Sequence, residues 1–261
     1  MKVKRALVTG GAKRLGREMA LYLGAQGFDV AVHFNGSEAA AKSVVEELEG
    51  LGCKAVACPA DLLSEDATAA LGPNAAEALG GPISVLINNA SIFEPDEIET
   101  ATRESWDRAM GSNLRAPFVL TQFLAGQAPA PSMDANGEPL AEALIVNMID
   151  QRVRKLTPDF VSYTVAKMGL WAFTQTSAQA LAGRVRVNGI GPGPTMQGIR
   201  QSEEHFRNQR SASITGRGAN PEDITHALGY LLGAHAVTGQ LICVDGGQHL
   251  GWQTPDVLGP E

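Results

Sequence analysis

Residues 5–16 read RALVTGGAKRLG, and this stretch decides the fold. The run Arg5–Thr9 is typical of a buried strand, and it leads through adjacent glycines into a helical stretch over residues 14–26. Gly10 and Gly16 allow the backbone to approach a phosphate, and the helix N-terminus supplies N–H donors and partial positive charge. A glycine turn that binds no ligand is the alternative. The order of strand, turn and helix favours a site for a dinucleotide.

The rest of the chain repeats this alternation of strand and helix. The predicted strands are Arg5–Thr9, Val30–Phe34, Ala55–Cys58, Val85–Asn88, Ala143–Met148, Val185–Gly189 and Leu241–Val244. The predicted helices cover about residues 14–26, 37–50, 64–79, 102–125, 160–182 and 221–233. Repeated switching between the two periodicities predicts a single doubly wound α/β domain over residues 1–261, with a parallel sheet of about seven strands and helices on both faces.

Two polar segments interrupt the pattern. Residues 127–142 contain three prolines and a glycine, so we expect a surface loop there. Residues 194–219 are rich in Ser, Gln and Arg and follow a strand, which predicts a lid over a substrate pocket.

Composition excludes several classes of protein. The chain has 261 residues, 44% of them apolar, and a formal charge of −7, which argues against a nucleic-acid partner. No apolar stretch approaches the roughly 20 residues that cross a bilayer, so we expect no membrane partner and a cytoplasmic protein. Cys53, Cys58 and Cys243 are odd in number and lack metal-ligand spacing, which predicts reduced thiols and no metal site.

A second pattern bears on catalysis. Tyr163 and Lys167 are four residues apart within the predicted helix 160–182, so both project from one face. A neighbouring ammonium lowers the pKa of a phenol, which makes tyrosine useful in proton transfer near neutrality. Such pairs also arise by chance on solvated helix faces, and only the rest of the chain separates the two interpretations.

The end of the second predicted strand bears on the choice of cofactor. An acidic residue there would hold the ribose 2′-hydroxyl of NAD. This chain instead offers His33, Asn35 and Ser37, with Lys13 on the glycine turn and no carboxylate before Glu38. Neutral and basic groups accept a 2′-phosphate, so we expect NADPH (NADP⁺) to be favoured over NADH.

Taken together, several motifs in order resemble the classical short-chain dehydrogenase/reductase family over nearly the whole chain. They are Thr9-Gly10…Gly16, Asp61-Leu62, Asn88-Asn89-Ala90, Asn113, Tyr163-x-x-x-Lys167, Pro192-Gly193 and Val244-Asp245-Gly246-Gly247. The resemblance implies a Rossmann-type fold and a homotetramer built partly through helices 102–125 and 160–182. It implies a catalytic centre of Asp150, Tyr163, Lys167 and Asn113, the last supporting a water-linked proton path. The implied cofactor-binding residues are Gly10, Lys13, Arg14, Leu15, Gly16, His33, Asn35, Ser37, Asp61, Leu62, Asn88, Ala90, Tyr163, Lys167, Pro192, Gly193 and Thr195.

Within this family, three segments are similar to pteridine reductases and bacterial dihydromonapterin reductases. These are Thr9–Gly16, the run Asn88-Asn-Ala-Ser-Ile-Phe93, and Asn147-Met-Ile-Asp150. The likeness implies that Arg14 reaches both the cofactor phosphates and a pterin, and that Phe93 sandwiches the pterin against the nicotinamide. The implied substrate-binding residues are Arg14, Ser91, Phe93, Asp150 and Tyr163. At the 2′-phosphate position the chain departs from those enzymes, because it has Asn35-Gly36-Ser37 in place of His-Arg-Ser.

An aspartate at position 150, where the wider family has serine, changes the chemistry. A carboxylate accepts hydrogen bonds but cannot donate them, repels a developing alkoxide and raises the pKa of a nearby phenol. Ketone reduction should suffer, whereas a substrate with N–H or amino groups should benefit. We therefore expect NADPH-dependent reduction of a pterin C=N bond.

Other interpretations remain open for each of these residues and for the function. Asp150 as a surface or capping residue, Phe93 as core filling, and Arg14 as a partner of the cofactor or a carboxylate alone are the structural alternatives. The alternative activity is an NADPH-dependent carbonyl reductase of the 3-oxoacyl-thioester or ketone type. A more remote one is a non-catalytic dinucleotide-binding sensor.

Overall fold

The computed structural model describes residues 1–198 and 200–252. At its centre is a seven-stranded sheet in the order β3-β2-β1-β4-β7-β8-β9, in which all neighbouring strands run parallel. The strands are β1 (Arg5–Val8), β2 (Asp29–Phe34), β3 (Ala55–Pro59), β4 (Val85–Asn88), β7 (Ala143–Met148), β8 (Val185–Pro192) and β9 (Leu241–Val244). The predicted parallel sheet is confirmed, although β8 continues past Gly189 to Pro192.

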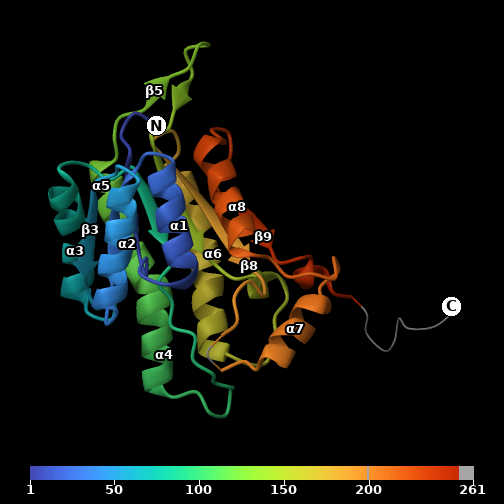
Figure 1. Ribbon diagram of the computed structural model, residues 1–261. Helices are drawn as coiled ribbons and strands as arrows, with labels where there is room; N and C mark the ends of the chain where they lie inside the picture. The colour runs from blue at the N-terminus through green and yellow to red at the C-terminus, as the bar shows by residue number, and fades with distance from the viewer. Residues whose placement is uncertain (199, 253–261) are drawn as a thin grey trace.

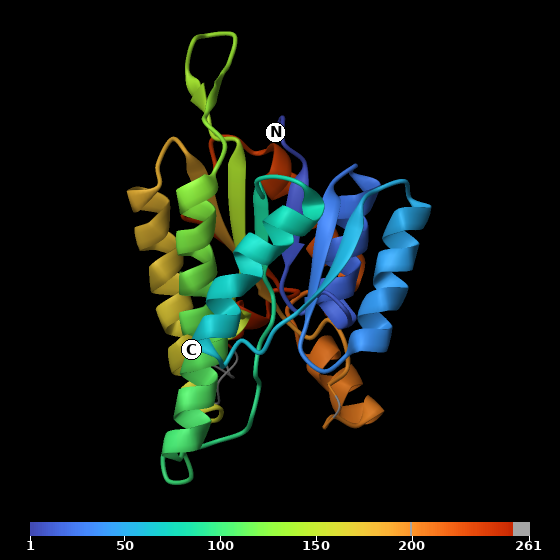
Figure 2. The same cartoon turned by 90° about the vertical axis from the view of Figure 1, so that its left-hand side faces the viewer.

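Helices cover both faces of this sheet (Figures 1 and 2). One face packs against α1 (Arg14–Ala25), α2 (Glu38–Gly50) and α8 (Pro221–Gly233); the other packs against α3 (Glu65–Leu79), α5 (Ala116–Gln127) and α6 (Val161–Ala180). Successive side chains of a strand alternate between the faces, so Ala6 and Val8 join the first core and Leu7 the second. Burial on both faces explains why the strands are continuous apolar runs in the sequence. Among the described helices none is long and apolar enough to span a membrane.

One predicted helix is divided. In place of a single helix over 102–125, the chain forms α4 (Arg103–Met110), a π-helical turn over Gly111–Arg115, and α5. The turn carries Asn113, whose side chain bonds both the N–H and the C=O of Ile92 at 2.9 and 2.8 Å. Such π turns often mark functional sites. Here the turn anchors the loop that leads to Phe93.

The segment predicted as a surface loop contains a short antiparallel hairpin, β5 (Ser132–Met133) and β6 (Pro139–Leu140). The carboxylate of Asp134 accepts from the backbone N–H groups of Asn136 and Glu138, both at 2.8 Å, which stabilises its turn. The hairpin precedes β7 and projects beyond the amino ends of the strands, whereas α7 (Glu203–Ser211) lies at the opposite end (Figure 1).

The strand order places a crevice at that opposite end. The chain passes from β1 outward to β2 and β3, and then returns to β4 on the other side of β1. Ligands of doubly wound sheets bind beyond the carboxyl ends of the strands where the order reverses, which here is between β1 and β4. The glycine turn and the loop to Phe93 both begin there.

Candidate active site

The glycine turn after β1 forms a backbone cradle. Gly10 has φ +61°, and a Cβ added to Gly16 would lie 2.1 Å from the carbonyl oxygen of Gly10. Only glycine permits this close approach. Arg14, in the position of a middle glycine, has φ +52°, a left-handed conformation that costs about 1–2 kcal/mol for a non-glycine residue. Because the turn leads directly into the N-terminus of α1, its geometry suits a pyrophosphate.

The His33 side chain holds this glycine turn through a hydrogen bond to Gly10. Its buried ring accepts a hydrogen bond at Nδ1 from the Gly10 N–H at 2.9 Å, and Nε2 lies 3.1 Å from the Ala60 carbonyl oxygen. These partners fix the neutral tautomer that carries its proton on Nε2. Both ring nitrogens are engaged with the backbone, so the ring holds the turn in place; the prediction that His33 also contacts the cofactor stays a prediction.

The other residues predicted around the adenosine end lie near the ends of β2 and β3. Lys13, Asn35 and Asp61 are exposed, and Ser37 and Leu62 are half-buried. Their contacts with a cofactor, including the 2′-phosphate, stay a prediction.

Asn88 lies behind the groove and not on its surface. Its buried amide donates to Oδ1 of Asn147 at 2.8 Å, and Asn147 donates to the Thr174 hydroxyl at 2.9 Å. This chain of side chains links β4, β7 and α6. The predicted lining role of Asn88 therefore becomes one of support, whereas Ala90, whose N–H donates to Thr9 Oγ1 at 3.0 Å, lies against the glycine turn.

The reaction centre joins β7 to α6. The Tyr163 hydroxyl donates to Asp150 Oδ2 at 2.8 Å, and Asp150 Oδ1 accepts from the Arg152 backbone N–H at 2.8 Å. Lys167 is buried, donates to the Met148 carbonyl oxygen at 2.7 Å, and has Nζ 5.6 Å from the centroid of the Tyr163 ring. The structure therefore brings together Asp150, Tyr163 and Lys167, and the carboxyl group is directed at the phenol rather than into solvent.

Burial dominates the electrostatics of these three groups. It raises the pKa of Asp150, an effect partly offset by its hydrogen bonds from Arg152 and Tyr163. Burial and the Asp150 carboxylate raise the pKa of Tyr163 well above its ordinary value, and burial lowers the pKa of Lys167 to about 8. The expectation that Lys167 lowers the pKa of the phenol is wrong here, because burial and the Asp150 carboxylate raise it; the expectation that Asp150 raises it is confirmed.

An aspartate that sequence reasoning missed fixes the start of α6. Buried Asp96 accepts from the Ser162 N–H at 3.1 Å and from the Ser105 hydroxyl at 3.2 Å, and its carbonyl oxygen accepts from the Phe160 N–H at 2.7 Å. A carboxylate is favourable at the N-terminus of a helix. Asp96 thereby helps to hold Tyr163, yet no local sequence pattern connects it to α6.

An aromatic pair borders the phenol. The Phe93 ring contacts Tyr163 edge-on, with centroids 4.7 Å apart, and is stacked on Phe160 at 4.2 Å and 9°. Phe93 is 44% exposed, which excludes simple core filling. Ser91 is also exposed, and its hydroxyl helps to lower the pKa of Tyr163. Asn113 acts on this wall through Ile92, so its side chain is committed to the loop; a proton path beside it stays a prediction.

Arg14 joins the glycine turn to the predicted lid. Its guanidinium donates to the carbonyl oxygens of Gln197 at 2.8 Å and Met196 at 3.0 Å, and not to a carboxylate. Arg200, in the same segment, donates to the Phe93 carbonyl oxygen. The segment 194–219, described here apart from residue 199, thus contacts both the turn and the aromatic wall.

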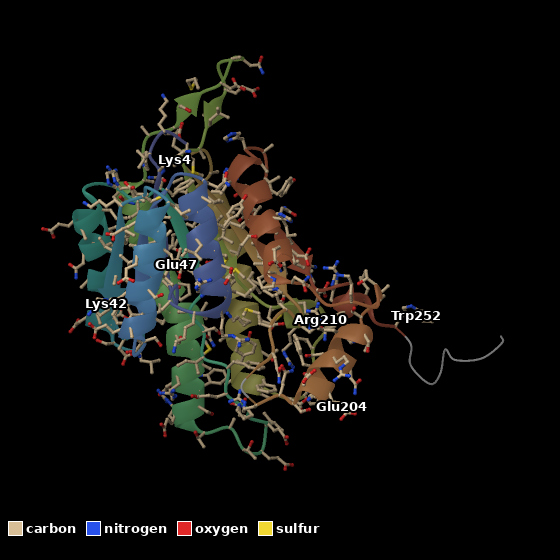
Figure 3. The ribbon with its side chains drawn as sticks, viewed as in Figure 1. Lys4, Lys42, Glu47, Glu204, Arg210 and Trp252 are labelled. Atoms are coloured by element: carbon tan, nitrogen blue, oxygen red, sulfur yellow. The ribbon has the colours of Figure 1, made fainter. Side chains whose placement is uncertain are left out.

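The base of this segment is fixed by Arg210, at the far end of α7 from Glu204 (Figure 3). Arg210 donates to the Pro194 carbonyl oxygen at 2.9 Å. Next to Pro194, Thr195 is buried and bonds the Gly193 carbonyl oxygen at 3.1 Å, and a Cβ at Gly193 would lie 2.6 Å from Asp245. Pro192, Gly193 and Thr195 therefore belong to a tightly packed segment at the end of β8, and their contacts with a cofactor stay a prediction.

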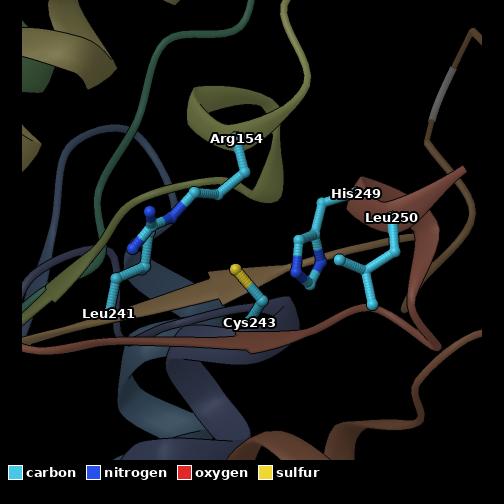
Figure 4. Close-up of a pocket in the computed structure, with 5 residues that line it drawn as sticks. All are labelled: Arg154, Leu241, Cys243, His249 and Leu250. Carbon is cyan, nitrogen blue, oxygen red and sulfur yellow. The ribbon is translucent and has the colours of Figure 1, made fainter.

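Two cavities in the described part of the chain are lined by residues other than Asp150, Tyr163 and Lys167. One, of about 480 Å³, is lined by Arg154, Leu241, Cys243, His249 and Leu250 (Figure 4). Burial raises the pKa of the Cys243 thiol to about 11, which makes it a poor nucleophile. The other, of about 220 Å³, is lined by Pro95, Asp96, Glu97, Thr100, Asp159 and Phe160. Among the described residues, no three His, Cys, Asp or Glu side chains gather as a metal site.

Comparison with known proteins defines the class. A family profile described as "Enoyl-(Acyl carrier protein) reductase" matches residues 10–249. The chain belongs to the short-chain dehydrogenase/reductase family, and it is an NAD(P)-dependent oxidoreductase of that type. The predicted family and Rossmann-type fold are confirmed.

Three relatives show the range of activities. FolM alternative dihydrofolate reductase 1 from Brucella suis, solved in complex with NADP, is 38% identical with a TM-score of 0.89, over 97% of this chain and 98% of that one. Angucycline C-6 ketoreductase LanV with bound NADP is 29% identical with a TM-score of 0.84, over 95% and 96%. The 3-oxoacyl-(acyl-carrier-protein) reductase FabG of Staphylococcus epidermidis is 28% identical over 252 residues, 95% of this chain and 99% of that protein. Bound NADP in the two solved relatives confirms the cofactor prediction at the level of the family.

Proposed function

We propose that the protein is an NADPH-dependent reductase of a pterin C=N bond, acting on a dihydropterin or on dihydrofolate. The observation that carries the proposal is the hydrogen bond from Tyr163 to Asp150 at 2.8 Å. It puts a carboxyl group, which can accept a hydrogen bond in either protonation state, where a ketone reductase needs a hydroxyl donor. The likeness to FolM supports the same reading.

The residues of the glycine turn fit the cofactor. Gly10 and Gly16 keep the cradle free of side chains. In the proposed complex Lys13 would hold the 2′-phosphate and Lys167 would bind the nicotinamide ribose. When bound, NADPH supplies the hydride that is transferred to a ring carbon of the substrate.

The wall beside Tyr163 fits a flat heterocycle. Phe93 is partly exposed and contacts the phenol edge-on. One face of its ring is stacked on Phe160 and the Arg200 guanidinium lies 5.8 Å from its centroid, so a pterin would stack on this ring in place of Arg200. Asp150 would accept from the amino and N–H groups of such a ring, and Arg14 would donate to one of its acceptors. A simple ketone offers no donor to satisfy the carboxylate.

Protons then move along the Asp150–Tyr163 pair. The phenol proton is directed at Asp150, so Tyr163 can donate to substrate only when Asp150 itself is protonated and the hydrogen bond reverses. The raised pKa of Asp150 favours that state. In this scheme Asp150 gives its proton to the Tyr163 oxygen while Tyr163 gives its own to the ring nitrogen next to the reduced carbon. Solvent then reprotonates Asp150.

A carbonyl reductase is the second candidate. The likeness to FabG and to LanV favours it, and it would use the same Tyr163 and Lys167. A carbonyl reductase, however, would make no use of the hydrogen-bond acceptor at Asp150.

NADPH oxidation with dihydrobiopterin, dihydromonapterin or dihydrofolate tests the proposal against a 3-oxoacyl thioester and a simple ketone. We expect turnover of at least one pterin and loss of that turnover in Tyr163→Phe. Turnover of the ketones without any pterin turnover would establish the carbonyl reductase instead.

A further inference from the structure

Arg152 lies behind the aromatic wall, and its charge lowers the pKa of both Asp150 and Tyr163. Arg152 belongs to the 3₁₀ turn Gln151–Arg154, and its guanidinium carbon lies 5.2 Å from the centroid of the Phe160 ring. Phe160 in turn is stacked on Phe93. The Arg152 guanidinium therefore packs on Phe160, on the side away from Phe93, and Phe93 contacts Tyr163.

The same side chain fastens the loop that carries Phe160. Its guanidinium donates to the Thr157 hydroxyl and to the Asp159 carbonyl oxygen, the latter at 3.4 Å. Its backbone N–H holds Oδ1 of Asp150. One residue thus contacts the catalytic carboxylate and the loop that sets the aromatic wall.

That loop needs fastening, because Phe160 has φ +58°. A left-handed conformation costs a bulky residue about 1–2 kcal/mol, and it persists only where neighbours impose it. The backbone N–H of Phe160 is held by Asp96, and the ring is held between Phe93 and the Arg152 guanidinium.

We propose that Arg152 is a positioning residue: it keeps the Phe160 ring against Phe93 and so fixes the place at which a flat substrate ring stacks beside Tyr163. Arginine suits this role better than lysine, since a planar guanidinium stacks on an aromatic face while donating in its own plane. The kinetic consequence rests on the proposed pterin chemistry, whereas the structural consequence concerns the loop alone.

The turn supplies a matched control. Arg154 lies two residues further on, is exposed, and has its guanidinium carbon 5.5 Å from the Trp171 ring. Arg154→Gln removes the same charge from the same turn without touching Phe160. The test set is Arg152→Gln, Arg152→Lys, Thr157→Val and Arg154→Gln.

Hydrogen exchange measured by mass spectrometry on the NADPH-saturated enzyme reports the loop directly. We expect amides of residues 157–162 to exchange on the order of tenfold faster in Arg152→Gln, less so in Arg152→Lys and Thr157→Val, and at the wild-type rate in Arg154→Gln. Unchanged exchange in Arg152→Gln, or an equal increase in Arg154→Gln, overturns the proposal. Should Arg152→Gln fail to fold, the Arg152→Lys and Thr157→Val rates decide in the same way.

Steady-state kinetics with dihydrobiopterin then separates positioning from chemistry. We expect Arg152→Gln to raise KM about tenfold while kcat falls less than about threefold, with partial rescue by Arg152→Lys and wild-type values for Arg154→Gln. A fall in kcat at constant KM contradicts the positioning role. If the wild-type enzyme reduces no pterin, the proposed function fails, yet the exchange result still decides the place of Arg152.

Discussion

Tyr163 directs its hydroxyl proton at Oδ2 of Asp150 across 2.8 Å, while the other oxygen of the carboxylate is taken by the Arg152 backbone. The aspartate is therefore built into the reaction centre and is not a surface or capping residue alone. The Asp150 carboxyl group and the Tyr163 phenol therefore share a proton. The charge of this pair determines which substrates suit it.

Replacing the carboxylate should exchange one substrate class for the other. Asp150→Ser removes the acceptor and supplies a hydroxyl donor. We expect kcat/KM for the dihydropterin to fall on the order of 10²-fold and that for a simple ketone to hold or rise. Both are measured by NADPH oxidation, with Asp150→Asn as the matched variant that keeps size but loses charge. Equal losses on both substrates would contradict this reading of Asp150.

The reduction should slow as the solution becomes alkaline. Burial lowers the pKa of Lys167 to about 8, so its ammonium form prevails below that pH and disappears above it. The transfer also consumes a proton, which favours the acidic side. We expect kcat/KM to fall about tenfold per pH unit above pH 8. Lys167→Arg stays charged and should lose this limb of the profile; a limb unchanged in that variant would assign it to another group.

Cofactor choice should depend on Lys13. Its exposed ammonium lies on the glycine turn, where only NADPH presents a 2′-phosphate. Lys13→Ala is expected to raise KM for NADPH about tenfold and to leave KM for NADH unchanged, as loss of one charge-assisted hydrogen bond predicts. Lys4→Ala, which removes an equal charge near the N-terminus (Figure 3), is the control. Parallel increases for both cofactors would show that Lys13 does not discriminate between them.

The expected homotetramer has a candidate contact surface. Trp106 on α4 and Met168 on α6 are 38% and 39% exposed on helices that pack together. Large apolar side chains on neighbouring helices favour burial against another copy of the chain. We expect Trp106→Glu with Met168→Glu to yield smaller species in light scattering, whereas Leu51→Glu, just after the end of α2, leaves the mass unchanged. A wild-type monomer would contradict the expectation at once.

Much of the fold could be predicted because the sheet is covered on both faces. The strand Ala143–Met148 is apolar except for Asn147, and its predicted bounds agree with the structure. The division of the helix predicted over 102–125 into α4, a π turn and α5 could not be predicted from the sequence. Nothing in the sequence marks a break at Gly111–Arg115, where the structure has the π turn whose Asn113 bonds Ile92.

The candidate site was predictable where a motif carries the chemistry. Tyr163, Lys167 and Asp150 do meet, whereas Phe160 and Arg152 gave no signal because their stacking on Phe93 depends on distant segments. The sequence predicted that Lys167 lowers the pKa of Tyr163 and that Asp150 raises it. The direction of the net shift depends on burial, about which the spacing of Tyr163 and Lys167 carries no information.

His33 gives the enzyme a vulnerability to acid. Nδ1 accepts a hydrogen bond from the Gly10 N–H. Protonation of Nδ1 therefore replaces this hydrogen bond by repulsion between two N–H groups and destabilises the glycine turn. Burial holds the pKa of His33 below its ordinary value; the unfolded chain therefore takes up this proton first, and stability declines as the pH falls below about 6.5. We accordingly expect the protein to bind the dinucleotide more weakly in acidic storage buffers and crystallisation conditions. Melting curves with and without NADPH at pH 5 and 7 would show this as a smaller stabilisation by NADPH at pH 5.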